Sequence, residues 1–162
     1  MITDLTESLK LAAKILSVRD VSVRELTDRL IKKKVEVGLV SETIDYLCEK
    51  NWYNEFNCAM EIARTRLRRS PVGGVLMTDY LLAKRFPEQL VERVVDKVYR
   101  EKSEIFFAEQ IVKKRISSLF KKFNGDKKRI NSFLSGYLIS RGFPEHICED
   151  IPAFEEYILD RE

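Results

Sequence analysis

The chain has 162 residues, of which 44% are hydrophobic and 34% are charged, with a net charge of +3. A chain of this length and composition can bury a domain-sized core, which excludes fibrous and intrinsically disordered proteins. The net charge is too small to indicate nucleic-acid binding unless the basic residues are clustered. Acidic rather than basic residues open the chain, and no apolar run is long enough to cross a bilayer, so we expect a cytoplasmic protein.

The first fifty residues predict three helices. Near the start of the chain, apolar residues are spaced four, three and four positions apart, at Leu5, Leu9, Ala12 and Leu16. This spacing places the four side chains on one face of a helix. Ser22 followed by Glu25 is a capping box that starts a second helix. A third helix is indicated by the apolar face that Leu39, Val40, Thr43, Ile44 and Leu47 form, so residues 1–52 are predicted to be one three-helix module.

The same pattern returns twice along the chain. The first stripe recurs as Phe56, Met60, Ala63 and Leu67, and again as Val112, Ile116, Leu119 and Phe123. Residues 80–94, YLLAKRFPEQLVERV, return 57 positions later as YLISRGFPEHICEDI, and a weaker copy begins at Asp28. Pro87 and Pro144 are tolerated only in the first turn of a helix, so FPE marks a helix start. Residues 53–100 and 101–162 are therefore predicted to be a second and a third module, the third with an acidic C-terminal tail.

The predicted fold class is all-α. No alternating apolar and polar run has the length of a strand, and nearly all glycines and prolines fall between the helical stripes. We expect three tandem three-helix modules in an elongated, curved array, each module packing on its neighbour. Pro152 interrupts the last helix of the third module, as is common in the terminal unit of a repeat array.

Basic residues are concentrated in the middle of the chain and acidic residues at its end. The candidate partner-binding or DNA-binding residues are Arg64, Arg66, Arg68, Arg69, Lys113, Lys114, Lys121, Lys122, Lys127, Lys128 and Arg129. These groups are denser than compensation of helix dipoles requires, so we expect them to meet a polyanion or an acidic protein groove. Residues 32–34, three lysines at the end of a helix, are explained by the dipole alone.

The sequence offers little catalytic chemistry. His146, the sole histidine, follows Phe-Pro-Glu and is expected on the surface. No residues have zinc-ligand spacing and no GxxxxGK[ST] loop is present, so we predict no catalytic residue, cofactor or metal. The cysteines form no CxxC pair and are expected to be reduced and buried, at Cys48, Cys58 and Cys148. Four aromatic residues able to stack on bases are expected to pack in the core or between modules instead: Trp52, Tyr53, Phe106 and Phe107.

Three segments, in order, match the pattern of a known family. SVRELTDRLIKKK fits a Ser-x-x-Glu-Leu-x-x-x-Leu helix through Ser22, Glu25, Leu26 and Leu30. A second segment, NWYNEFNCAMEIARTRLRR, fits the pattern Gly-aromatic-Leu-Asp-Asp-x-x-Phe-Ala-x-x-Tyr-x-x-x-Arg, with matches at Trp52, Ala59, Arg64 and Arg66. Glu55 keeps the acidic charge of the second Asp. The segment departs from the pattern at Asn51, Asn54 and Cys58. SRGFPEHICEDI, residues 140–151, follows a basic-Gly-aromatic pattern. In order and spacing these segments resemble the RecX family, over roughly residues 9–151.

The resemblance implies a non-enzymatic modulator. Members of the RecX family bind RecA recombinase filaments on single-stranded DNA, lie along the helical groove, and depress strand exchange, ATP hydrolysis and co-protease activity. ATP and Mg²⁺ then belong to the partner, and this chain is expected to be a monomer that reaches single-stranded DNA through the filament. Motif matching supports Arg64 and Arg66 as interface residues, and charge density supplies the others.

Two other classes of function stay open. A stand-alone nucleic-acid-binding protein would act through phosphate contacts, because the basic residues are Lys-rich and no helix has the Asn, Gln and Arg spacing that reads base edges. A helical scaffold for another protein partner is also compatible with the predicted fold. The acidic tail suggests a further hypothesis, in which like-charge repulsion keeps the free protein from binding duplex DNA indiscriminately.

Overall fold

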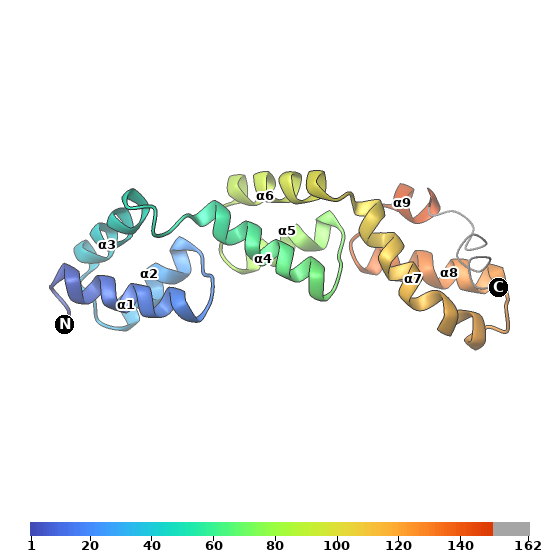
Figure 1. The fold of residues 1–162 in the computed structure, drawn as a ribbon, viewed down its shortest axis with the longest axis horizontal. Helices are drawn as coiled ribbons and strands as arrows, with labels where there is room; N and C mark the ends of the chain where they lie inside the picture. Colours follow the sequence, from blue (N-terminus) through green and yellow to red (C-terminus); the bar gives the residue numbers. More distant parts are fainter. Residues whose placement is uncertain (151–162) are drawn as a thin grey trace. The chain divides into compact units, whose positions relative to one another are not determined.

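A computed structural model describes residues 1–150, and these residues confirm the all-α prediction (Figure 1). The described helices are α1 (Leu5–Val18), α2 (Val23–Lys32), α3 (Val37–Glu49), α4 (Glu55–Arg69), α5 (Gly74–Ala83), α6 (Glu88–Glu101), α7 (Glu104–Lys122), α8 (Lys127–Ser140) and α9 (Glu145–Asp150). Strand pairing in the described part is limited to one isolated bridge, between Ile2 and Val35. The predictions for Pro152 and for the acidic tail lie outside the described residues.

The chain divides into two compact units, and each is described by itself. The first unit contains residues 1–63 and 80–94, and the second contains residues 64–79 and, of the described residues, 95–150. Helices α4, α5 and α6 contribute residues to both units. The division into three modules at 1–52, 53–100 and 101–162 stays a prediction.

In the first unit, α1, α2 and α3 pack against one another around an apolar core. Ala12, Leu26 and Leu30 are completely buried there. A buried polar pair lies among them, because the Ser8 and Thr43 hydroxyl oxygens are 2.7 Å apart and satisfy each other. The predicted cap is confirmed, since the Ser22 hydroxyl accepts a hydrogen bond of 3.2 Å from the Glu25 amide.

In the second unit, α7, α8 and α9 pack against one another in the same way. The core of this unit includes Ala108, Val112, Ile116, Leu119, Ile130, Leu134, Leu138, Phe143 and Ile147. The predicted helix starts are confirmed to within one residue, because Pro87 directly precedes α6 and Pro144 directly precedes α9. No helix of the described residues combines the length and the apolar character that a membrane span requires.

The helices α2, α5 and α8 end with the same backbone geometry. The second residue after each helix end has a left-handed conformation, with φ of 65° at Lys34, 68° at Arg85 and 81° at Gly142. The next amide bonds back to a helix carbonyl oxygen: Val35 to Leu30 (3.1 Å), Phe86 to Leu81 (3.4 Å) and Phe143 to Leu138 (3.2 Å). This is the pattern of a Schellman cap, with a buried apolar residue directly after the left-handed one. At these positions the repeat in sequence is also a repeat in local structure.

The first residues of α2 and of α5 make the same kinds of hydrogen bond. The Val23 amide, first in α2, donates to the Glu55 carboxylate at 2.8 Å, and the Gly74 amide, first in α5, donates to the Glu104 carboxylate. Two residues earlier, the carbonyl oxygens of Val21 and Val72 each accept a hydrogen bond of 2.7 Å from a tyrosine hydroxyl, of Tyr53 and Tyr99 respectively. Burial raises the pKa of both tyrosines, so both phenols stay protonated donors.

Two predictions of burial were wrong in part. Tyr53 and Phe107 are buried as expected, but Trp52 is 66% exposed and Phe106 is 37% exposed. Asn51 has a left-handed φ of 54° after α3, and the chain there turns so that Tyr53 points inward and Trp52 outward. Phe106 is exposed because it directly precedes buried Phe107, and adjacent residues of a helix face different sides.

The cysteine prediction was also wrong at one position. Cys58 and Cys148 are buried free thiols, and burial raises the pKa of Cys58 to about 12. Cys48 is exposed because it follows the buried Leu47 on α3 and is turned away from the core face. The surface position predicted for His146 is confirmed.

Two loop backbones approach so closely in the second unit that substitution of one glycine should destabilise it. A Cβ atom on Gly73 would lie 2.1 Å from the Gly142 carbonyl oxygen, where the Gly73 amide already bonds to the Arg141 oxygen at 2.9 Å. We expect Gly73→Ala to lower the free energy of unfolding by about 1–3 kcal/mol through overpacking. Gly136→Ala is the matched control, because open space surrounds this helical position and alanine there should stabilise by about 0.5–1 kcal/mol. Thermal melting of both variants checks this, and equal melting temperatures would contradict it.

Removing a carboxylate that caps an earlier helix should weaken the fold. Glu55→Ala deletes the acceptor of the Val23 amide, a part-buried hydrogen bond to a charged group, so we expect a loss of about 1–3 kcal/mol. Glu42→Ala removes an exposed carboxylate of α3 and should change stability by less than about 0.5 kcal/mol. Urea unfolding followed by circular dichroism measures both. A Glu55 variant as stable as the Glu42 variant would show that the cap is dispensable.

Candidate functional site

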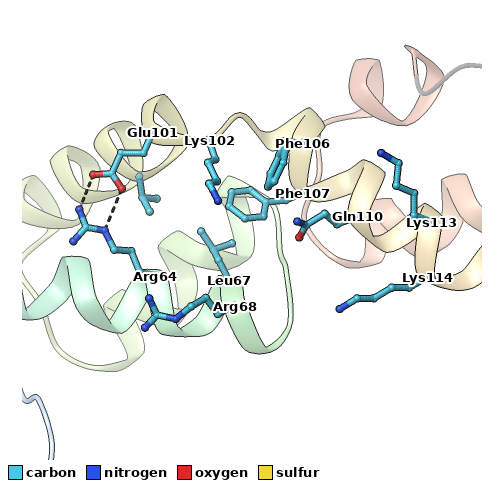
Figure 2. Close-up of a pocket in the computed structure, with 11 residues that line it drawn as sticks. Arg64, Leu67, Arg68, Glu101, Lys102, Phe106, Phe107, Gln110, Lys113 and Lys114 are labelled. Atoms are coloured by element: carbon cyan, nitrogen blue, oxygen red, sulfur yellow. Dashed lines mark hydrogen bonds and ion pairs between the residues drawn. The ribbon is translucent and has the colours of Figure 1, made fainter.

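Four of the predicted basic residues line one pocket of the second unit (Figure 2). Arg64 and Arg68 come from α4, and Lys113 and Lys114 come from α7. Lys102, at the turn between α6 and α7, adds a fifth cation that sequence reasoning missed. The pocket has a volume of about 640 Å³. We call it the basic pocket, and its other lining residues are Leu67, Val98, Glu101, Phe106, Phe107 and Gln110.

Local structure explains why these cations meet. Arg64 and Arg68 are one helical turn apart, so both lie on one face of α4. Helix α7 begins almost directly after α6, because the Ser103 hydroxyl caps it by accepting a hydrogen bond of 3.2 Å from the Phe106 amide. The short turn at Lys102 therefore carries the chain from the α6 side of the pocket to the α7 side.

The floor of the basic pocket is apolar. Leu67, Val98 and Phe107 are buried, whereas Phe106 stays partly exposed and meets the Phe107 ring edge-on with centroids 5.4 Å apart. The Lys102 ammonium lies 5.0 Å from the Phe106 ring centroid, within range of a cation–π interaction. The pocket thus combines a cationic rim with an apolar surface.

Positive charge dominates the rim. Glu101 is the one carboxylate among the described residues that line the pocket, against five cations. Arg64 binds it with both arms of the guanidinium, through Nη2 to Oε1 at 2.6 Å and Nε to Oε2 at 3.1 Å. Hydrogen bonding from Arg64 is the main cause that lowers the pKa of Glu101, so the carboxylate stays charged. The formal balance of five cations and one anion leaves the pocket suited to an anionic ligand.

Comparison with known proteins supports the resemblance to the RecX family. No family model matches the chain. A curated relative from Chlorobium limicola, named regulatory protein RecX, is 34% identical over 89 residues, which are 55% of this chain and just over half, 56%, of that protein. Another of the same name, from Pelodictyon phaeoclathratiforme, is 26% identical over 136 residues, covering 84% of this chain and 81% of the relative. These two relatives support the assignment of the chain to the RecX family.

Solved structures of RecX proteins share its fold. The crystal structure of RecX from Lactobacillus salivarius superposes with a TM-score of 0.78 at 20% identity, covering 96% of this chain and 97% of that one. A second crystal structure, of regulatory protein RecX, gives a TM-score of 0.68 at 17% identity, covering 91% of this chain and 70% of that one. The all-helical architecture described above is therefore the RecX fold.

The remaining predicted residues do not line the basic pocket. Arg66, which is half-buried, and Arg69, which is exposed, lie near the end of α4. The others lie around the turn between α7 and α8, at Lys121, Lys122, Lys127, Lys128 and Arg129. We call this second group the α7–α8 corner. The Lys122 ammonium lies 5.3 Å from the Phe123 ring centroid and 5.2 Å from that of Phe133.

The α7–α8 corner contains cations that a helix dipole does not explain. Lys121 and Lys122 lie in the last turn of α7, where the dipole favours them, but Lys127, Lys128 and Arg129 occupy the first turn of α8, where it opposes them. Asp126 caps α8 by accepting from the Arg129 amide at 3.2 Å and forms an ion pair of 3.4 Å with the Arg129 side chain.

Sequence reasoning also left out residues that have a structural role. Arg115 belongs to the basic run with Lys113 and Lys114, but its guanidinium lies 4.0 Å above the Tyr137 ring and donates to the Tyr137 hydroxyl at 2.9 Å.

Within residues 1–150, no group of His, Cys, Asp and Glu side chains could hold a metal ion. The cations and the apolar residues that line the basic pocket suit the binding of anionic and apolar groups.

Replacing Arg64 should raise the pKa of Glu101 back toward its ordinary value of 4.5. Because the folded-state pKa is lowered, the pair contributes stability above pH 4.5 and loses it as the pH falls through the folded pKa. Arg68→Gln is the matched control, since Arg68 donates to Thr65 at 2.8 Å instead. NMR titration of the carboxyl carbon in Arg64→Gln and Arg68→Gln measures the effect, and an equal pKa in both variants would contradict the assignment.

Proposed function

We propose that this chain is a non-enzymatic regulator that binds the RecA recombinase filament on single-stranded DNA and lowers its recombination, ATPase and co-protease activities. The observation that carries the proposal is the basic pocket, where cations from α4 and α7, separated by more than forty positions in the sequence, converge around an apolar floor. Membership of a family of regulatory proteins supports the regulatory role. The chain would act in the cytoplasm as a monomer, and ATP and Mg²⁺ would belong to the filament.

The chemistry of the pocket favours an acidic protein surface as its target. Such a surface supplies carboxylates for the cationic rim and apolar side chains for Leu67, Val98 and Phe107, whereas a solvated helix face needs no recessed apolar floor. A regulator held in the helical groove of the filament by such contacts blocks addition of further subunits or promotes their release. Either effect lowers the number of active ATPase sites on the DNA.

The α7–α8 corner favours a second candidate function, binding to nucleic acid without a recombinase. Three cations in the first turn of α8 lie where they lower helix stability, and phosphate groups would offset that loss. A protein that acts in this way alone competes for single-stranded DNA, and its affinity falls steeply with salt as counterions are released. The two candidates therefore differ in which macromolecule must be present for inhibition.

The deciding experiment is ATP hydrolysis by the cognate RecA on single-stranded DNA, with this protein titrated in. DNA affinity without RecA is recorded in parallel across salt concentrations. We expect hydrolysis to fall at protein concentrations where free DNA is barely bound. A fall only as DNA becomes sequestered would favour the nucleic-acid-binding candidate, and no effect in either assay would leave a helical scaffold with another partner.

Charge reversal tests whether the basic pocket is the surface that binds the partner. Lys113→Glu with Lys114→Glu reverses two cations of the basic pocket, and we expect inhibition to weaken at least about tenfold, or 1.4 kcal/mol. Lys32→Glu with Lys33→Glu is the matched control, because these exposed lysines at the end of α2 are explained by the helix dipole. Equal inhibition by the two double variants would exclude the basic pocket as the binding surface.

A further inference from the structure

Glu101 is the one carboxylate among the described residues that line the basic pocket, and it binds a cation of the rim. We propose that Glu101 is an intramolecular competitor, which holds the Arg64 guanidinium in the free protein and is displaced by a carboxylate of the partner. The ligand of the pocket is then a short acidic peptide segment with an apolar side chain. Binding exchanges one carboxylate for another at Arg64.

The pair has the geometry that a ligand carboxylate needs. Arg64 donates through Nη2 to Oε1 at 2.6 Å and through Nε to Oε2 at 3.1 Å, the two-point contact that planar guanidinium and carboxylate groups favour. The other arginine of the rim, Arg68, donates to the Thr65 hydroxyl at 2.8 Å. Arg64 is therefore already oriented to bind a carboxylate at the pocket, and in the free protein Glu101 supplies it.

The pair is weak enough to exchange. The Arg64 side chain is 36% exposed and that of Glu101 is 39% exposed, so water screens the attraction between them. Exposed ion pairs of this kind change an equilibrium constant by up to about fivefold. A buried pair would be far harder to open, because each charge would lose its partner without gaining water. Partial exposure therefore makes Glu101 a replaceable partner of Arg64.

The rest of the pocket supplies contacts that let a ligand displace Glu101. Figure 2 shows the pair beside α4 and α6, with Lys113 and Lys114 on the α7 side of the pocket. An acidic segment that reaches across binds cations on both sides, and an apolar side chain in its middle covers the floor beside Phe106. Glu101 offers one carboxylate alone, so a segment with several carboxylates makes contacts that Glu101 lacks. The volume of about 640 Å³ is that of a ligand pocket, which suits a short segment.

Competition by Glu101 would make the pocket selective. An anion with a single charge replaces Glu101 at Arg64 without a further gain, so its occupancy stays low. A segment that also binds the other cations and the apolar floor has a net gain on exchange. The role of this selection in regulation rests on the proposed function, in which the acidic segment belongs to the filament. The exchange itself can be measured without the filament.

A thermodynamic cycle with a synthetic peptide tests the exchange without RecA or DNA. The probe is an acetylated Glu-Glu-Phe-Glu-Glu peptide that carries a fluorophore, and its binding is followed by fluorescence anisotropy. We expect Glu101→Gln to tighten binding at least about threefold. Because removal of any carboxylate from a basic surface favours anions, the deciding quantity is the effect of Arg64→Gln with and without Glu101.

The proposal predicts that loss of Arg64 matters more when Glu101 is absent. In the chain with Glu101, the peptide only replaces one partner of Arg64 by another, so Arg64→Gln should weaken binding by less than about threefold. In the Glu101→Gln background the peptide gains the whole contact, and Arg64→Gln should weaken binding about tenfold. Lys114→Gln is the matched control, because it removes a cation of the same pocket and should have equal effects in both backgrounds.

The other outcomes overturn the proposal. Equal effects of Arg64→Gln in the two backgrounds would show that Glu101 acts through its charge alone. A smaller effect in the Glu101→Gln background would show that Glu101 positions Arg64 for the ligand. If a thymidine oligonucleotide binds and the peptide does not, the pocket is a phosphate site, and binding of neither probe would also exclude the acidic segment. Because no recombinase is present, failure here leaves the proposed function to the ATPase experiment, and failure there leaves the exchange at Arg64 to this one.

Discussion

A carboxylate at the start of one helix binds the first amide of an earlier helix at two places in the chain. A helix start has backbone amides without partners inside the helix and the positive end of the dipole, so an acidic side chain satisfies both. Glu55, the first residue of α4, does this for α2, and Glu104, the first residue of α7, does it for α5. In the second unit this contact fixes the start of α7 against α5. Since Phe106 and Phe107 follow Glu104 directly, the same contact positions the apolar floor of the basic pocket.

The pocket is basic because five cations and one carboxylate line it. Arg64 and Glu101 pair through two hydrogen bonds, which orders both side chains at the edge of the pocket. The other cations come from a helix end, a turn and the exposed face of α7, where no further carboxylate lines the described pocket. Concentrating like charges beside an apolar surface lowers the stability of the free protein. An anionic ligand recovers that free energy, which is why such a surface favours binding over a purely structural role.

Much of the fold was predictable because short-range sequence patterns determine where the helices begin and which faces they bury. Apolar spacing identified buried faces around Ala12 and Ile116, and FPE marked the starts of α6 and α9. The candidate site was predictable only in part. Charge density along the sequence predicted the basic residues of 121–129 and of 113–114 as binding residues alike. Only Lys113 and Lys114 line the pocket, because the packing of α7 near α4 depends on the tertiary structure. Lys102 was missed since a single lysine at a helix end has no signal in sequence, and Trp52 was misplaced because its orientation follows from a left-handed residue before it.

The two basic surfaces of the second unit differ in what surrounds their cations, and this difference is informative. The basic pocket has an apolar floor, so desolvated carboxylates next to apolar side chains suit it best. The α7–α8 corner places cations of both helix ends around one turn, with Lys127 and Lys128 exposed at the start of α8. Exposed lysines on flexible stems suit phosphate groups, because phosphate binding depends on positive charge more than on shape complementarity. On the proposed function, a nucleoprotein filament would offer both chemistries at once, and two surfaces of this kind on one unit would suit such a composite target.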